Sequence, residues 1–130
     1  MKIFDCFMFY DEEMLLNMRM NILNDYVDYF VIVESNRFHN GDKRRLKFDI
    51  AKYSKFKDKI IYLIHDKNLD QLKKISRIDE EGTKSYKLIF NAHLRENDQR
   101  NLIIKGLNKA AEDDLIIISD VDEIPNFNSI

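Results

Sequence analysis

The sequence predicts an α/β fold with one open, mainly parallel sheet flanked by helices. Short apolar runs alternate along the chain with longer amphipathic or polar stretches, as in units in which a helix connects two parallel strands. The chain has 130 residues, of which 45% are hydrophobic, with only three glycines and one proline. This length and composition suit a single hydrophobic core without linkers, so we expect one domain over residues 1–130.

Four apolar runs predict the strands, and these are Ile3–Phe9, Tyr29–Val33, Ile60–Ile64 and Leu115–Ser119. The last run contains four consecutive aliphatic residues, which is typical of a strand covered on both faces. Polar residues follow the later runs, and ligands of parallel sheets bind at the carboxyl ends of the strands. We therefore expect Cys6–Phe9, Glu34, His65 and Asp120 to lie at the carboxyl ends of neighbouring strands.

The segments between the strands predict helices. Asp11 is a favourable N-cap for the first helix, whose buried stripe is expected on one face at Met14, Leu15, Met18 and Ile22. Residues 48–56 predict a short helix or turn, and the charged stretch Asp66–Lys87 predicts an irregular insertion. The most regular helix candidate is Ala92–Ala111, with a packed face of Arg100, Ile103, Ile104, Leu107 and Ala111.

Arg100 is an unusual residue for a packed helix face because a guanidinium there needs an anion. Glu96 lies four residues earlier, in the favourable order for a helix salt bridge. A phosphate or other substrate group is the alternative partner. Either partner would draw the Arg100 side chain out of water.

Three carboxylates follow the last predicted strand, in the segment Ser119-Asp120-Val121-Asp122-Glu123-Ile124-Pro125. On an extended backbone Asp120 and Asp122 would point the same way, about 6–7 Å apart, which allows them to share one hydrated divalent ion. Mg²⁺ and Mn²⁺ take few carboxylates and complete their shells with water and substrate phosphates. We expect Mn²⁺ or Mg²⁺ at these aspartates and a diphosphate-bearing substrate; a solvated acidic turn closed by Pro125 is the alternative.

Charge and cysteine content exclude several other partners. The 21 basic and 23 acidic residues are interspersed and give a net charge of −2, so nothing favours nucleic acid or an anionic membrane. Cys6 is the single cysteine and cannot form an intrachain disulfide, which favours a reducing compartment. No stretch approaches the ~20 apolar residues of a membrane span. We expect a soluble, cytoplasmic protein.

The pairing of V-E-S-N-R at residues 33–37 with S-D-V-D-E-I-P at residues 119–125 resembles family 17 glycosyltransferases. Residues 4–7, 27–32, 99–101 and 113–114 add to the resemblance, which covers nearly the whole chain. This family contains the β-1,4-N-acetylglucosaminyltransferases that add bisecting N-acetylglucosamine to N-glycans. The resemblance implies a GT-A-like, Rossmann-like fold, a UDP-sugar donor, a glycan acceptor and a divalent metal at the D-x-D motif.

The resemblance also implies roles for individual residues. Asp120 would lie near the ribose or sugar of the donor, and Asp122 would bind the metal that bridges the two phosphates. Glu34 would grip the base or ribose, and Arg100 would approach the donor from its helix. The remaining expected donor contacts are Phe7, Asn36, Arg37 and His65.

Members of this family continue beyond D-V-D-E-I-P, where the acceptor site and catalytic base of an inverting GT-A enzyme usually lie. We therefore expect a truncated domain: the donor-binding part, without its catalytic base and with an open apolar face that favours self-association. Two alternative functions stay open. A non-catalytic nucleotide- or metal-binding module fits the short length, and a haloacid-dehalogenase-type phosphatase also places D-x-D after an aliphatic strand.

Overall fold

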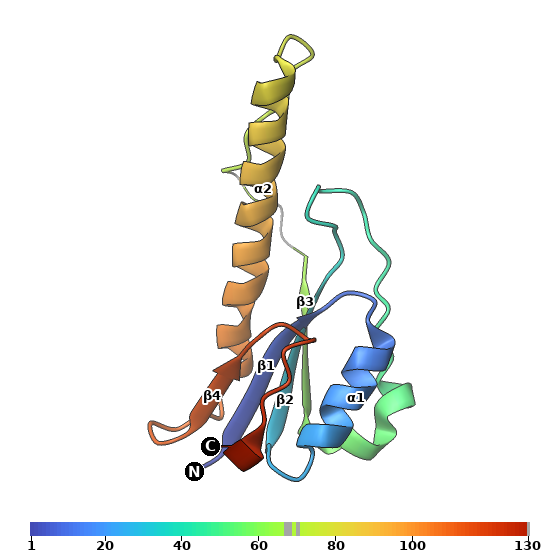
Figure 1. Cartoon of the computed structure of the whole chain (residues 1–130), viewed down its shortest axis with the longest axis vertical. Coiled ribbons are helices and arrows are strands. Elements are labelled where there is room, and N and C mark those ends of the chain that lie inside the picture. Colours follow the sequence, from blue (N-terminus) through green and yellow to red (C-terminus); the bar gives the residue numbers. More distant parts are fainter. Residues whose placement is uncertain (67–68, 70, 130) are drawn as a thin grey trace.

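In a computed structural model, which describes residues 1–66, 69 and 71–129, the chain forms a four-stranded parallel sheet in the order β3-β2-β1-β4 (Figure 1). The strands are β1 (Ile3–Phe9), β2 (Tyr29–Ser35), β3 (Ile60–His65) and β4 (Leu115–Ile118). The helices are α1 (Glu13–Leu23) and α2 (Glu81–Asn101), with shorter 3₁₀ segments η1 (Ile50–Lys59), η2 (Leu102–Gly106) and η3 (Phe127–Ser129). The expected α/β fold with a parallel sheet is confirmed.

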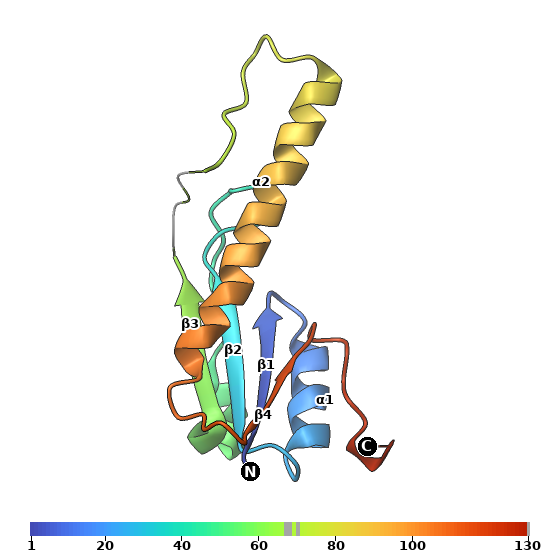
Figure 2. The same cartoon turned by 90° about the vertical axis from the view of Figure 1, so that its left-hand side faces the viewer.

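Helical segments cover both faces of the sheet (Figures 1 and 2). Alternate side chains of β1 and β2 point to opposite faces, as the pleat of a strand requires. On one face Phe7, Phe9, Phe30 and Ile32 pack against α1 and η1. On the other face Phe4, Cys6, Val31 and Val33 pack against η2, mainly through Ile103.

The carboxyl ends of the strands lie in one row. Phe9 is opposite Glu34 across β1 and β2, and Ser35 is opposite His65 across β2 and β3. On the other side of β1, Cys6 is opposite Ile118, so Asp120 follows the end of β4. The expected row of strand ends is therefore confirmed. Glu34 and Asp120 come from strands that are separated only by β1.

The expected buried face of α1 is wrong. Met14, Met18 and Ile22 are exposed, whereas the residues that face the sheet are Leu16, Arg19, Met20 and Leu23. Both sets have helical spacing, and the buried set contains an arginine that pairs with Asp5 of β1. Asp11 is also not the N-cap, because α1 begins at Glu13 after Glu12, which makes no side-chain capping bond.

The boundaries of α2 also differ from the sequence-based expectation. The helix begins at Glu81 rather than Ala92 and gives way to η2 at Leu102, so only part of Asp66–Lys87 is irregular; residues 67, 68 and 70 lie outside the described residues. An ion pair of 2.7 Å between Lys87 and Asp79 ties the first turns of α2 to the preceding segment. The amino-terminal half of α2 projects beyond the sheet (Figures 1 and 2).

Two other burial expectations are corrected. β4 is an edge strand that is not covered on both faces, since Leu115 and Ile118 are exposed. The change from α2 to η2 turns Ile104 outward, while Ile103 is buried against β2. None of the helices in the described ranges has the length and apolar content needed to cross a membrane.

Candidate donor and metal site

The acidic segment after β4 forms a turn rather than an extension of the strand. The Glu123 amide donates to the Asp120 carbonyl at 2.9 Å, and the Asp120 amide donates to the Glu123 carboxylate at 2.9 Å. The expected period-two geometry of Asp120 and Asp122 is therefore wrong. The Glu123 carboxylate is used to close the turn, which leaves Asp120 and Asp122 as its outward-facing carboxylates.

These two aspartates line a pocket of about 250 Å³ at the carboxyl ends of β1 and β4, which we name the acidic pocket. Four carboxylates surround this space: Glu12, Glu96, Asp120 and Asp122. Tyr10, His39 and three apolar residues complete the lining. Arg100 balances part of this charge, since it lies 3.3 Å from Glu96 and 3.9 Å from Asp120, and the remaining negative charge attracts a cation.

Tyr10, at the end of β1, is held by residues from two other parts of the chain. Its hydroxyl donates to Gln99 of α2 at 2.7 Å and also contacts His39 Nε2. Gln99 is fully buried and donates in turn to the Val33 carbonyl at 3.3 Å, which fixes its amide orientation. Burial, together with nearby Glu96, raises the pKa of Tyr10, so this hydroxyl stays protonated.

His39 reaches the acidic pocket from the loop that follows β2. Arg95 of α2 donates to the His39 carbonyl at 2.7 Å. Gly41 turns this loop with a positive φ of 95°, and a Cβ there would lie 2.6 Å from the Arg95 guanidinium. The backbone conformation therefore requires glycine, and any larger residue would also displace the Arg95 guanidinium.

A second pocket, of about 350 Å³, shares Tyr10 and His39 with the first; we name it the Arg44 pocket. Its other lining residues are Asp11, Phe38, Arg44 and Lys47. Phe38 is exposed there. The Tyr10–His39 contact thus separates a space lined by carboxylates from one that carries two cations and an aromatic ring.

Arg100 makes the expected ion pair with Glu96 and also approaches Asp120. Its guanidinium lies 3.3 Å from the Glu96 carboxylate and 3.9 Å from the Asp120 carboxylate. The Arg100 side chain remains 44% exposed, so it is not buried on the sheet as the helix pattern suggested. It instead lines a neighbouring pocket, together with Ile118, Ser119, Asp120 and Glu123.

Glu34, expected to grip the base or ribose, is instead a buried structural acceptor. Its side chain is fully buried and pairs with Arg44 at 2.7 Å. The same carboxylate accepts hydrogen bonds from the Lys47 and Phe48 amides and from the Tyr62 hydroxyl. These four donors occupy both oxygens, so Glu34 anchors the 44–48 loop to the end of β2.

Three more expected donor contacts also lie away from the acidic pocket. Phe7 is fully buried in the core, with the Arg19 guanidinium 4.7 Å from its ring centre. Asn36 donates to Asp66 at 2.6 Å, and Arg37 donates to the Gly41 carbonyl at 3.1 Å. The structure thus gives Phe7 a packing role and uses the other two to hold loops.

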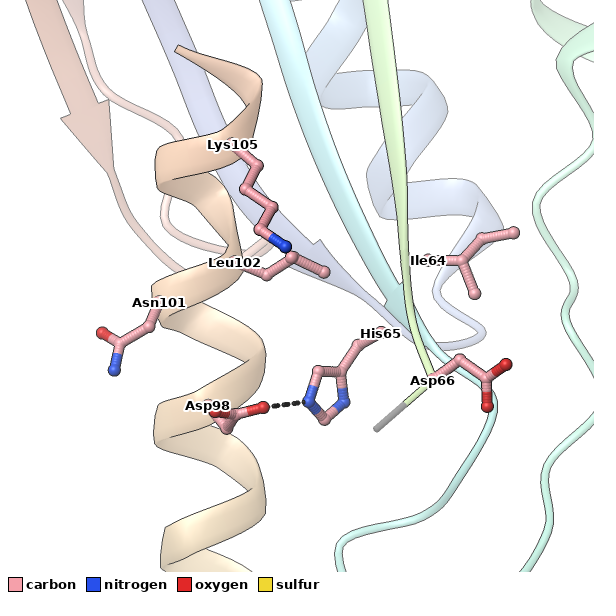
Figure 3. A pocket seen from close by; sticks show the side chains of 7 residues that line it. All are labelled: Ile64, His65, Asp66, Asp98, Asn101, Leu102 and Lys105. Carbon is pink, nitrogen blue, oxygen red and sulfur yellow. Dashed lines mark hydrogen bonds and ion pairs between the residues drawn. The ribbon is translucent and has the colours of Figure 1, made fainter. Parts of the chain in front are cut away.

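His65 lies in a separate pocket of about 340 Å³ between β3 and α2 (Figure 3). Its Nε2 is 2.6 Å from the Asp98 carboxylate, and Asp66 and Lys105 line the same pocket. β3 and β4 are opposite edges of the sheet, about 14 Å apart at three strand spacings. His65 and Asp120 therefore line different pockets.

The donor set of the acidic pocket fits a hard divalent cation that takes few ligands from the protein. Among the described residues, no group of three or more His, Cys, Asp or Glu side chains is arranged to hold a metal by itself. Asp120 is 61% exposed, and the two aspartates offer oxygen ligands only. Such ligands suit Mg²⁺ or Mn²⁺, which take few protein oxygens and fill the rest of their shells with water and substrate phosphates.

Sequence reasoning missed Tyr10, Glu12 and His39 as pocket residues. Tyr10 and Glu12 follow directly after β1, so the rule that ligands bind at carboxyl strand ends would have included them. His39 carried no such signal, since its position depends on the turn at Gly41 and on Arg95, fifty-six residues later.

A family model described as "Glycosyltransferase family 17" matches residues 1–130, the whole chain. The chain belongs to glycosyltransferase family 17. It is therefore a transferase that acts on a sugar donor and an acceptor, and the phosphatase alternative loses its support. Searches among curated proteins and among solved structures gave no match.

Proposed function

We propose that this family 17 chain binds a nucleoside diphosphate sugar, with a UDP-sugar and N-acetylglucosamine as the expected donor and transferred sugar, for transfer to a glycan. The observation that carries the proposal is the acidic pocket at the ends of β1 and β4, in which Asp120 and Asp122 face Glu12 and Glu96. A diphosphate and these carboxylates repel each other. A cation between them turns that repulsion into attraction.

Asp120 and Asp122 are the residues that would hold Mn²⁺ or Mg²⁺. When bound, the ion would neutralise the donor's phosphates and stabilise the departing nucleoside diphosphate. Arg100, 3.9 Å from Asp120, supplies a further positive charge beside the phosphates. The Arg44 pocket, with Phe38 on its wall, offers a neighbouring space for another part of the donor.

Calorimetry of UDP binding with and without Mn²⁺ tests this proposal. Mn²⁺ alone should bind weakly because few protein ligands contact it, and UDP should bind more tightly in its presence. The coupling must be reciprocal, so UDP should raise Mn²⁺ affinity by the same factor. Asp122→Ala should abolish the coupling while the unfolding transition stays that of the wild type.

Asp113→Ala is the matched control because Asp113 is an exposed aspartate at the amino-terminal side of β4. Asp114 is unsuitable, since it accepts the amides of Lys2 and Ala111 at 2.8 and 2.7 Å. Equal Mn²⁺-linked UDP binding by wild type and Asp122→Ala would refute the metal assignment. Absence of UDP binding in the wild type would refute the donor assignment for this chain.

A further inference from the structure

Arg19 on the buried face of α1 has a fully buried side chain whose N–H groups all reach acceptors. Nε and Nη2 donate to the Asp5 carboxylate at 2.8 and 2.6 Å, a two-pronged pair with β1. Nη2 also donates to the Ser119 hydroxyl at 2.6 Å. The remaining nitrogen, Nη1, is directed at the backbone of the acidic turn.

Nη1 donates to three carbonyls of that turn. It lies 2.7 Å from the carbonyl of Asp120, 3.2 Å from that of Val121 and 2.9 Å from that of Glu123. The chain separation is about a hundred residues, as in the 101 between Arg19 and Asp120. One guanidinium therefore joins β1, α1 and the segment that carries the D-x-D motif.

A buried ion pair of this kind is not explained by its contribution to stability alone. Removing two charges from water is costly, and apolar residues of similar size often stabilise a core as well or better. An apolar side chain on α1 could fill the space beside Phe7. An apolar side chain could not, however, donate hydrogen bonds to the three carbonyl oxygens of the turn. The planar guanidinium, with its five N–H donors, does so here.

The arrangement also determines which groups of the turn face the acidic pocket. The carbonyls of Asp120, Val121 and Glu123 are engaged by Arg19, whereas the side chains of Asp120 and Asp122 line the pocket. Residues that hold the ligands of a metal site in place commonly matter for its affinity almost as much as the ligands.

We propose that Arg19 and its counter-ion Asp5 are positioning residues for the metal and diphosphate site, fixing the backbone of the acidic turn so that Asp120 and Asp122 face the acidic pocket. This inference rests on the proposed function for its consequence in binding. Its structural basis, the hold of Arg19 on residues 119–123, is measurable without any ligand.

The test uses the double variant Asp5→Leu/Arg19→Met, which removes both charges together and leaves neither unpaired. We expect it to fold, and we expect the amides of residues 119–123 to exchange with solvent about tenfold faster or more, as expected for losing hydrogen bonds to a charged donor. The Mn²⁺-linked gain in UDP affinity should fall by about 10- to 100-fold.

Lys59→Met is the matched control. Lys59 also donates to two backbone carbonyls, of Asn24 and Val27, at 2.7 and 3.0 Å, but it lies before β3, at the opposite end of the sheet. This variant should change neither the exchange of residues 119–123 nor the binding of UDP. If the double variant does not fold, Arg19→Lys replaces it, keeping the charge opposite Asp5 while losing the fork that reaches the turn.

Unchanged exchange at residues 119–123 in the folded variant would overturn the proposal, and so would faster exchange with unchanged Mn²⁺-linked UDP affinity. If Mn²⁺ does not increase the UDP affinity of the wild type, both the proposed function and the positioning role of Arg19 in it are refuted. The exchange data then still decide whether Arg19 holds the turn, which separates the two failures.

Discussion

Replacing Glu34 by glutamine tests whether this residue supports the fold or contacts the donor. The substitution keeps the shape of the side chain but replaces one accepting oxygen by an NH₂ group, which only donates. In the wild type both oxygens accept: one from Arg44 and the Lys47 amide, each at 2.7 Å, and the other from the Phe48 amide and the Tyr62 hydroxyl at 3.1 and 2.7 Å. In Glu34→Gln, two of these hydrogen-bond donors therefore point at the new NH₂ group, which cannot accept a hydrogen bond.

The expected loss of stability is about 3–5 kcal/mol, the range for removing one partner of a buried ion pair. The pair is desolvated, with side chains 2% and 0% exposed for Arg44 and Glu34, so solvent screening does not reduce this figure. Domains of this size are stable by only about 5–15 kcal/mol. Glu34→Gln should therefore unfold at a much lower urea concentration, as followed by circular dichroism.

Glu13→Gln is the control for this comparison. Glu13 pairs with Lys52 at 3.5 Å, but both side chains are about half exposed, so the substitution should cost less than about 1 kcal/mol. UDP affinity should be unchanged in Glu13→Gln. The structural role of Glu34 would be refuted if Glu34→Gln unfolded like the wild type while its UDP affinity fell.

Two further perturbations test the packing and the ionisation of the core. Gly106→Ala would place a Cβ 2.5 Å from Val31 Cγ1 and should destabilise the fold by about 1–3 kcal/mol. Its control is Gly82→Ala, which has open space around it and should be neutral or stabilising in urea titrations. Equal effects of the two substitutions would contradict the close contact of η2 with β2. Burial raises the pKa of the Cys6 thiol from 9.0 to about 12 and, with Glu96, raises that of Tyr10. Both groups ionise more readily in the unfolded chain, so the urea concentration at the unfolding midpoint should be constant below about pH 9 and should decrease above it. An unfolding midpoint that increased at alkaline pH would contradict this.

The strands were predictable because their signal is local. A run of aliphatic residues such as Tyr29–Val33 is apolar on both faces, and no distant partner is needed to recognise it. The observed strands agree with the predicted runs at their starts, β1 also agrees at its end, and the ends of the other three differ by one or two residues. The position of Asp120 at the end of β4 followed from the same local pattern.

The helix faces were less predictable because long-range partners decide them. On α1 two apolar sets have helical spacing, and the buried one contains Arg19, whose partner Asp5 lies on another strand. Helical spacing alone does not distinguish the two sets, and the predicted set at Met14 and Met18 is the exposed one. The start of α2 was missed for a related reason, since the pairing of Lys87 with Asp79 lies in a stretch with weak apolar periodicity.

Glu34 shows the limit of reasoning from strand ends. A polar residue at the carboxyl end of a parallel strand suits a ligand contact and a loop anchor equally well. Glu34 anchors a loop because Arg44, ten residues later, pairs with it. The conformation of that loop determines whether Arg44 reaches Glu34. The Asp122 side chain, in contrast, lines the acidic pocket.

The place of β4 beside β1 has a consequence for biosynthesis. β1, β2 and β3 are all made before residue 66, whereas the strand that covers the free edge of β1 emerges only at residues 115–118. During translation the nascent sheet thus carries an unpaired edge, of the kind that recruits strands from other chains. The acidic turn can bind Arg19 only after β4 has been made, so we expect the capacity to bind the donor to appear only as this edge closes. When pairing of β4 with β1 is delayed, we expect the chain to aggregate rather than to accumulate as a folded protein without the acidic pocket.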